Sequence, residues 1–221
     1  MNVTSTDPSR KRPSPREAGR WIHGPRAKRT RSAREAWLIY ACLLVLAGCS
    51  FFSKSKSTTY ALDPIAPAAA ADRGTAALAK RGAPVAINTI ELPPGLDRLE
   101  IVVRTSNGQL EVRSNELWPA NLQPVVLHAL SFDLASRLPE GMVVLPGESR
   151  PGAPPREIDV VFEDFTAGPD KRVTLDARWT LAGTSHHERL AIDIPSLDSG
   201  AVATGTSQAL AALSDRIAAG L

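Results

Sequence analysis

The chain has 221 residues and carries 26 Lys and Arg against 23 Asp and Glu, a net charge of +3. Ten of the basic and three of the acidic side chains lie in the first 35 residues, which leaves 16 basic and 20 acidic side chains in the rest. A basic excess confined to one terminal segment does not indicate a nucleic-acid-binding protein, and the acidic remainder is long enough for one domain with a sizeable core.

An apolar run without a charge extends from Trp37 to Gly48 and ends at Cys49. Its length is too short for a membrane-spanning helix, which needs about 20 residues, but it fits the apolar region of a secretory signal peptide. The basic segment upstream is the matching charged region. An over-extended start would account for the unusual length of that segment.

The end of this run, Leu46-Ala47-Gly48-Cys49, resembles the bacterial lipobox. The resemblance implies cleavage before Cys49 and attachment of diacylglycerol and an acyl chain such as palmitate, and several chains together hold a protein to a membrane permanently. We therefore predict a signal peptide over residues 1–48 and a lipidated tether over 49–58, the alternative being a buried structural cysteine. Ser50 is not the aspartate of an inner-membrane retention signal, which favours the outer membrane.

Short alternating segments in the first part of the remaining chain predict strands. We expect strands at Thr59–Leu62 and Val85–Leu92, joined by an Ala- and Pro-rich connection over 64–84 with one weak helical turn at Ala76–Lys80.

The clearest pair of strands is Leu99–Arg104 with Gln109–Arg113, in which apolar and polar residues alternate. Asn107-Gly108 between them predicts a two-residue hairpin turn with positive φ at both positions.

Helical spacing of apolar residues predicts two amphipathic helices, Pro119–Leu138 and Asp198–Leu221. On the first, Asn121, His128, Asp133 and Arg137 fall outside the apolar stripe. A short strand is expected at Met142–Leu145.

Between the helices, three alternating segments separated by Gly-rich turns predict an antiparallel meander. The segments are Ile158–Glu163, Val173–Leu181 and Glu188–Ile194. Together these elements predict a single α+β domain over residues 59–221, with a mostly antiparallel sheet layered with two amphipathic helices.

The sequence contains no glycine-rich phosphate loop, no G-x-S-x-G and no H-E-x-x-H. His186 and His187 are adjacent on a predicted strand and therefore point to opposite faces, so they cannot chelate one ion together. We predict no enzymatic activity, no cofactor and no metal site.

Residues 85–134 resemble the PqiC/YmbA family of ABC-type transport auxiliary lipoproteins. The resemblance rests on "ELPPGLDRLEIVVR", on the hairpin that follows and on a tryptophan, Trp118, that opens a helix. Gly95 and Leu99-Glu100 depart from the family pattern.

This resemblance implies an outer-membrane lipoprotein on the periplasmic face that works with an MCE-domain protein, an ABC permease and an ATPase to move lipids. Its implied role is docking, and a homo-oligomeric ring is compatible with it. The candidate partner-binding residues are Asp97, Arg98, Arg104 and Trp118. Asp97 and Arg98 have an alternative role as a cap or ion pair within the domain. The alternative function is a free-standing periplasmic lipoprotein that binds a ligand or remodels the envelope.

Overall fold

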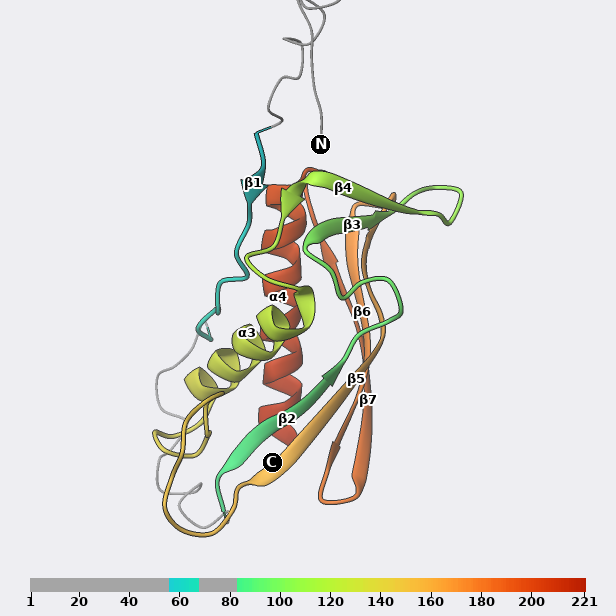
Figure 1. The fold of residues 1–221 in the computed structure, drawn as a ribbon. Coiled ribbons are helices and arrows are strands. Elements are labelled where there is room, and N and C mark those ends of the chain that lie inside the picture. The colour runs from blue at the N-terminus through green and yellow to red at the C-terminus, as the bar shows by residue number, and fades with distance from the viewer. Residues whose placement is uncertain (1–55, 68–82) are drawn as a thin grey trace, which may run out of the picture. The chain divides into compact units, whose positions relative to one another are not determined.

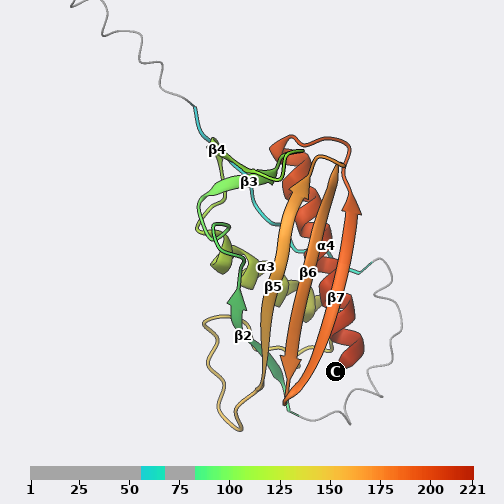
Figure 2. The same ribbon diagram turned by 90° about the vertical axis from the view of Figure 1, so that its right-hand side faces the viewer.

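A mixed sheet of seven strands, with two helices against one of its faces, forms the α+β domain (Figures 1 and 2). The computed structural model describes residues 56–67 and 83–221. In chain order the elements are β1 (Thr58–Thr59), β2 (Val85–Glu91), β3 (Glu100–Arg104), β4 (Leu110–Leu117), α3 (Leu122–Arg137), β5 (Arg156–Gly168), β6 (Arg172–Leu181), β7 (Thr184–Asp193) and α4 (Ser199–Gly220).

The antiparallel meander β5–β6–β7, which the sequence predicted, forms one side of the sheet, with β7 at the edge. The inward side chains of β6 are all buried, from Val173 to Leu181 at alternate positions. They pack beneath α4, whose apolar stripe includes Val202, Leu210 and Ile217. Asp198 accepts a hydrogen bond from the backbone N–H of Ala201 and so caps this helix.

Parallel pairings complete the sheet. β2 runs parallel to the first half of β5, and β3 meets the end of β5 through Val103 and Ala167. Parallel neighbours need a long crossover connection, and α3 lies in the one between β2 and β5. β4 pairs with β3, and β1 adds two residues parallel to β4 at Glu116 and Leu117.

Two predicted strands are shorter than expected. The segment predicted at Thr59–Leu62 pairs only at β1, while Leu62 is buried in the core. Met142–Leu145 contributes a single bridge between Val143 and Val85. The weak helical turn predicted at Ala76–Lys80 lies outside the described residues.

The prediction for α3 is correct in position but wrong for two polar residues. Asp133 and Arg137 were expected outside the apolar stripe, yet their side chains are 1% and 2% exposed. They are buried because residues 56–67, which we call the N-terminal strap, cover this part of the helix and bond to both side chains at Ile65.

The hairpin turn also differs from its prediction. The N–H of Gly108 donates to the carbonyl of Thr105, and the N–H of Thr105 donates to the carbonyl of Gln109. Gly108 has φ 81°, whereas Asn107 is not among the described residues with positive φ. The loop is therefore a turn followed by a single left-handed glycine, the three-residue hairpin connection, instead of a two-residue turn.

Gly108→Val is expected to destabilise the domain by about 1–3 kcal/mol, because a β-branched residue must adopt positive φ. No atom lies within 4 Å of a Cβ at this position, so the effect comes from the backbone alone. Urea unfolding monitored by circular dichroism measures it. Ser106→Val, in the same loop without positive φ, is the control, and equal midpoints for the two variants would contradict the turn assignment.

Candidate functional site

Cys49, the predicted lipid anchor, lies outside the described residues, so its lipidation stays a prediction. The described part of the chain begins at Lys56, seven positions after Cys49. No helix in the two described ranges is long and apolar enough to cross a membrane.

Asp97 occupies the exposed loop between β2 and β3, next to the first turn of α3. Its Oδ1 accepts a hydrogen bond from the backbone N–H of Gln123 at 2.9 Å. The N-cap residue Asn121 makes no such side-chain bond, and the first N–H groups of a helix need acceptors. Asp97 therefore caps α3 from a distant point in the sequence.

Arg98 forms an ion pair with Glu100, with Nε 2.9 Å from Oε2. The hydrogen bond from Arg98 lowers the pKa of the Glu100 carboxyl. Both side chains are about one-third exposed, and such pairs contribute little to stability. Arg98 can therefore contact a partner without loss of the fold.

Arg104 lies at the other end of β3 and faces β5. Its guanidinium is 3.2 Å from Asp164 and 3.3 Å from the hydroxyl of Thr166. The length of β3 thus separates Arg104 from the loop that carries Asp97 and Arg98. The candidate partner-binding residues do not form one continuous patch.

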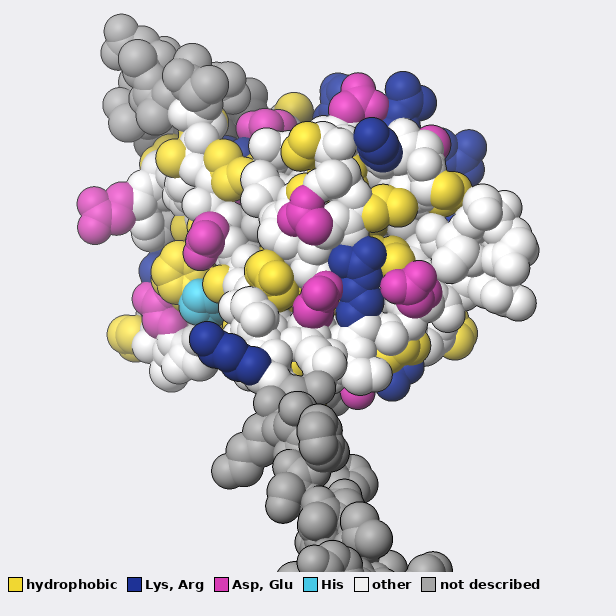
Figure 3. All heavy atoms as spheres, turned by 90° about the horizontal axis from the view of Figure 1, so that it is seen from above, with side chains coloured by type: hydrophobic (Ala, Val, Ile, Leu, Met, Phe, Trp, Pro, Cys, Tyr) yellow, Lys and Arg dark blue, Asp and Glu magenta, His cyan; other side chains and the backbone are white. Residues whose placement is uncertain are grey.

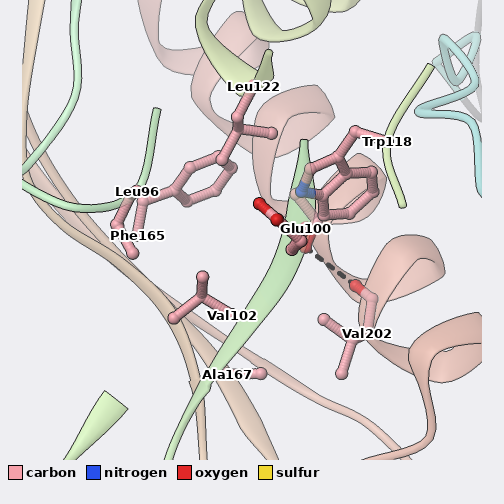
Figure 4. A pocket seen from close by; sticks show the side chains of 9 residues that line it. Leu96, Glu100, Val102, Trp118, Leu122, Phe165, Ala167 and Val202 are labelled. Atoms are coloured by element: carbon pink, nitrogen blue, oxygen red, sulfur yellow. Dashed lines mark hydrogen bonds between the residues drawn. The ribbon is translucent and has the colours of Figure 1, made fainter. Parts of the chain in front are cut away.

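Trp118 is only 5% exposed and lines a small cavity between the hairpin and α4. Figure 4 shows Trp118, Leu122 and Phe165 around this space. The cavity volume is about 20 Å³, room for a single water molecule. Trp118 therefore packs within the domain, and the more exposed candidates for partner contact are Asp97, Arg98 and Arg104.

The uncovered face of the meander carries a network of charged side chains. Glu163, Asp176 and His187 place donor atoms within 4.8 Å of one another. Arg178 already pairs with Glu163 at 2.7 Å, and Arg189 pairs with Asp176 at 2.6 Å. Because each carboxylate has an arginine partner, the arrangement favours an ion-pair network over a metal centre.

The same network explains the ionisation of Asp176. Burial acts to raise the pKa of this carboxyl, but hydrogen bonds from His187 and Arg189 outweigh it and hold the pKa below its usual value. On the other face of β7, His186 stacks on Trp179 with ring centroids 3.9 Å apart. The two histidines thus point to opposite faces, as strand geometry predicts.

Asp133 and Arg137 form a buried cluster that sequence reasoning missed. Asp133 Oδ1 accepts the N–H of Ile65 at 2.7 Å, and Arg137 donates to the carbonyl of Ile65 at 3.0 Å and to Asp215 of α4 at 2.9 Å. We call these contacts the strap clip. Burial raises the pKa of Asp133 to about 6. The (i, i+4) spacing of Asp133 and Arg137 was the available signal, although it is equally typical of an exposed helix pair.

The strap leaves a groove of about 400 Å³ against α4. Tyr60, Ala61 and Ile65 form one wall, and small residues of α4, among them Ala203 and Ser207, form the other. The groove exists because the side chains of α4 are small at this position, and the strap forms its opposite boundary.

Comparison with models of known protein families identifies the family of this chain. Residues 60–218 match the family described as the ABC-type transport auxiliary lipoprotein component. The chain belongs to this family.

The match covers nearly all of the described domain of this auxiliary lipoprotein and confirms the resemblance found in the sequence. The family consists of transport components and is not a known family of enzymes. A search of curated proteins found no match.

Solved structures support the fold of the auxiliary lipoprotein. An uncharacterised protein shares 19% identity with a TM-score of 0.59, over 75% of this chain and 98% of that chain. Protein XCC0632 from Xanthomonas campestris, of the DUF330 family, shares 16% identity with a TM-score of 0.55, over 73% of this chain and 93% of that chain.

Proposed function

We propose that this chain is a lipid-anchored docking subunit, held by Cys49 on the periplasmic face of the outer membrane, of an MCE-type lipid transport system. Its partners are an MCE-domain protein, an ABC permease and an ATPase, and it is compatible with a homo-oligomeric ring. The family match over residues 60–218, combined with the lipobox that ends at Cys49, is the observation that carries this proposal.

The shape of the domain supports docking over lipid carriage. The cavity beside Trp118 has room for one water molecule, far less than an acyl chain needs. The groove beside α4 is open and bordered by polar as well as apolar residues. Lipid is therefore expected to pass through a partner, while this subunit supplies position and contact.

The anchor is tested by Cys49→Ala. This change is expected to abolish incorporation of a palmitate analogue and to leave an uncleaved precursor, because the modified thiol is absent. Metabolic labelling and electrophoretic mobility measure the two effects. Replacement of the other cysteine, Cys42→Ala, is the control and should leave both unchanged. Undiminished labelling of the Cys49→Ala variant would contradict the assignment of Cys49 as the lipid anchor.

The docking role of the Asp97–Arg98 loop is tested by separating charge from capping. Asp97→Asn combined with Arg98→Gln keeps an oxygen acceptor for the N–H of Gln123 but removes both charges. If this loop contacts the partner, the double variant melts near the wild-type temperature, no longer co-purifies with the MCE-domain protein and fails to restore detergent resistance.

Two comparisons make this result specific. Asp97→Ala also loses the cap and is expected to cost about 0.5–2 kcal/mol of stability. Arg172→Gln with Asp193→Asn removes another exposed ion pair and should leave binding intact. A stable Asp97/Arg98 variant that still captures the partner and complements would reject this loop as the contact surface.

A further inference from the structure

Two exposed aliphatic side chains, Leu110 and Val112, lie on β4 near the turn of the β3–β4 hairpin, and a third, Leu99, precedes β3 at the opposite end. Five large hydrophobic side chains are exposed in the described residues, and three of them are Leu99, Leu110 and Val112. Leu110 is 43% exposed and Val112 is 38% exposed. Alternation in the sequence indicated a half-buried strand, but within the described residues no helix covers the first residues of β4, which face solvent.

The two side chains of β4 share one face, because they are two residues apart on a strand. Across the hairpin, Val112 lies opposite Val102 and Leu110 lies opposite Arg104. Directly opposite residues of an antiparallel pair project to the same side. The hairpin therefore presents an aliphatic strip bordered by Arg104, whose guanidinium pairs with Asp164. Exposed aliphatic side chains next to a basic residue suit a membrane interface.

This hairpin lies at the end of the domain where the chain enters from Cys49. β1 pairs with Glu116 and Leu117 of β4, and Figures 1 and 2 show β1, β3 and β4 at one end. Lys56 follows Cys49 by seven positions, and an extended chain spans about 3.5 Å per residue, so Lys56 lies within about 25 Å of an anchored lipid. Leu110 is at the opposite end of β4 from the pairing with β1, about 20 Å further on. Figure 3, the view onto this end, shows hydrophobic side chains exposed among charged ones.

We propose that the β3–β4 hairpin rests on the bilayer surface, with Leu110 and Val112 inserted at the boundary between headgroups and acyl chains. The inference rests on the proposed anchor at Cys49. Two aliphatic side chains are far too few for a stable protein interface, which buries about 800 Å² on each partner. They suffice against a membrane because the short tether already holds the domain at high local concentration beside it.

Site-specific fluorescence tests this contact. The mature chain has no cysteine other than Cys49, whose thiol is consumed by lipidation, so one introduced cysteine is labelled uniquely. Lipidated protein carrying Leu110→Cys or Val112→Cys is labelled with the environment-sensitive dye NBD. It is then reconstituted in vesicles of phosphatidylethanolamine with a minor fraction of phosphatidylglycerol. The control is Val161→Cys on β5, a valine of matched exposure at 40% that lies outside the hairpin.

The expected result is a blue-shifted emission at positions 110 and 112, with quenching by spin-labelled lipid, and neither effect at 161. Vesicle flotation, measured on the same samples, distinguishes failure of the lipid anchor from failure of the hairpin contact. Protein that fails to float overturns the anchor and the hairpin contact together. Protein that floats without a blue shift at 110 and 112 overturns the hairpin contact alone. A blue shift that grows with protein density but is not quenched by spin-labelled lipid indicates contact with a second copy and also overturns it.

Discussion

Arg137→Ala is expected to destabilise the domain by about 3–5 kcal/mol, because it leaves the buried carboxylate of Asp133 without a cation. The variant also loses the hydrogen bonds that Arg137 donates to Ile65 and Asp215, so the strap clip opens. Chemical unfolding at neutral pH measures the effect. Arg172→Ala, which removes an exposed pair with Asp193, is the control and should change stability by less than about 1 kcal/mol.

The strap clip also gives stability a specific pH dependence. The pKa of Asp133 is about 6 in the folded chain, above its ordinary value of 3.8. Between these values the folded state holds a proton that the unfolded state has released, so stability from this group is greatest below pH 4 and is lost as the pH rises through 6. The loss amounts to about 3 kcal/mol. Asp133→Asn keeps an acceptor for Ile65 and should flatten the profile; an unchanged slope would contradict the assignment.

Gly205→Val is expected to cost about 3 kcal/mol, because α4 packs at this glycine with no room for a larger side chain. A Cβ there would lie 2.4 Å from Cγ2 of Ile194 and 2.8 Å from Cγ2 of Val173. Both neighbours are buried, so neither can move without disturbing the core. Thermal unfolding of the variant measures the loss.

Gly200→Ala, on the same helix, is the matched control. Its Cβ would meet Asp198 at 3.3 Å and Tyr60 at 3.7 Å, contacts that a small shift relieves. Gly200 is in the first turn of α4, where replacement by alanine has a small effect, so this variant should stay within about 1 kcal/mol of wild-type stability. Equal stability of Gly205→Val and wild type would mean that α4 does not pack as the structure shows.

Local sequence patterns were sufficient to predict the helices and strands, but not which strands pair with each other in the sheet. Alternation along β6 and the stripe on α4 depend only on nearby residues, and both predictions are confirmed. The parallel pairing of β2 with β5 joins Val85 to Arg156 across 71 positions, and no local pattern encodes it.

The same limit explains the residues that were placed wrongly. Asp133 is polar by sequence, but it is buried because the strap supplies its hydrogen bond from 68 positions away. A cap was the alternative role predicted for Asp97 and is confirmed, but no local pattern links it to α3, because its donor, the N–H of Gln123, lies 26 positions away. Leu110 and Val112 alternate like core residues, yet an edge hairpin without a covering layer leaves them exposed.

The strap also determines where mechanical load enters the domain. With the anchor at Cys49 that we propose, a pull reaches Thr58 and Thr59 first, which pair with β4. It reaches the strap clip at Ile65 only after this pairing breaks. β4 and α3 therefore take the strain, while the β5–β7 meander lies behind them in the load path. Tension on the tether would accordingly detach the strap first. This would lengthen the unfolded segment between Cys49 and the domain before the β5–β7 meander is disturbed.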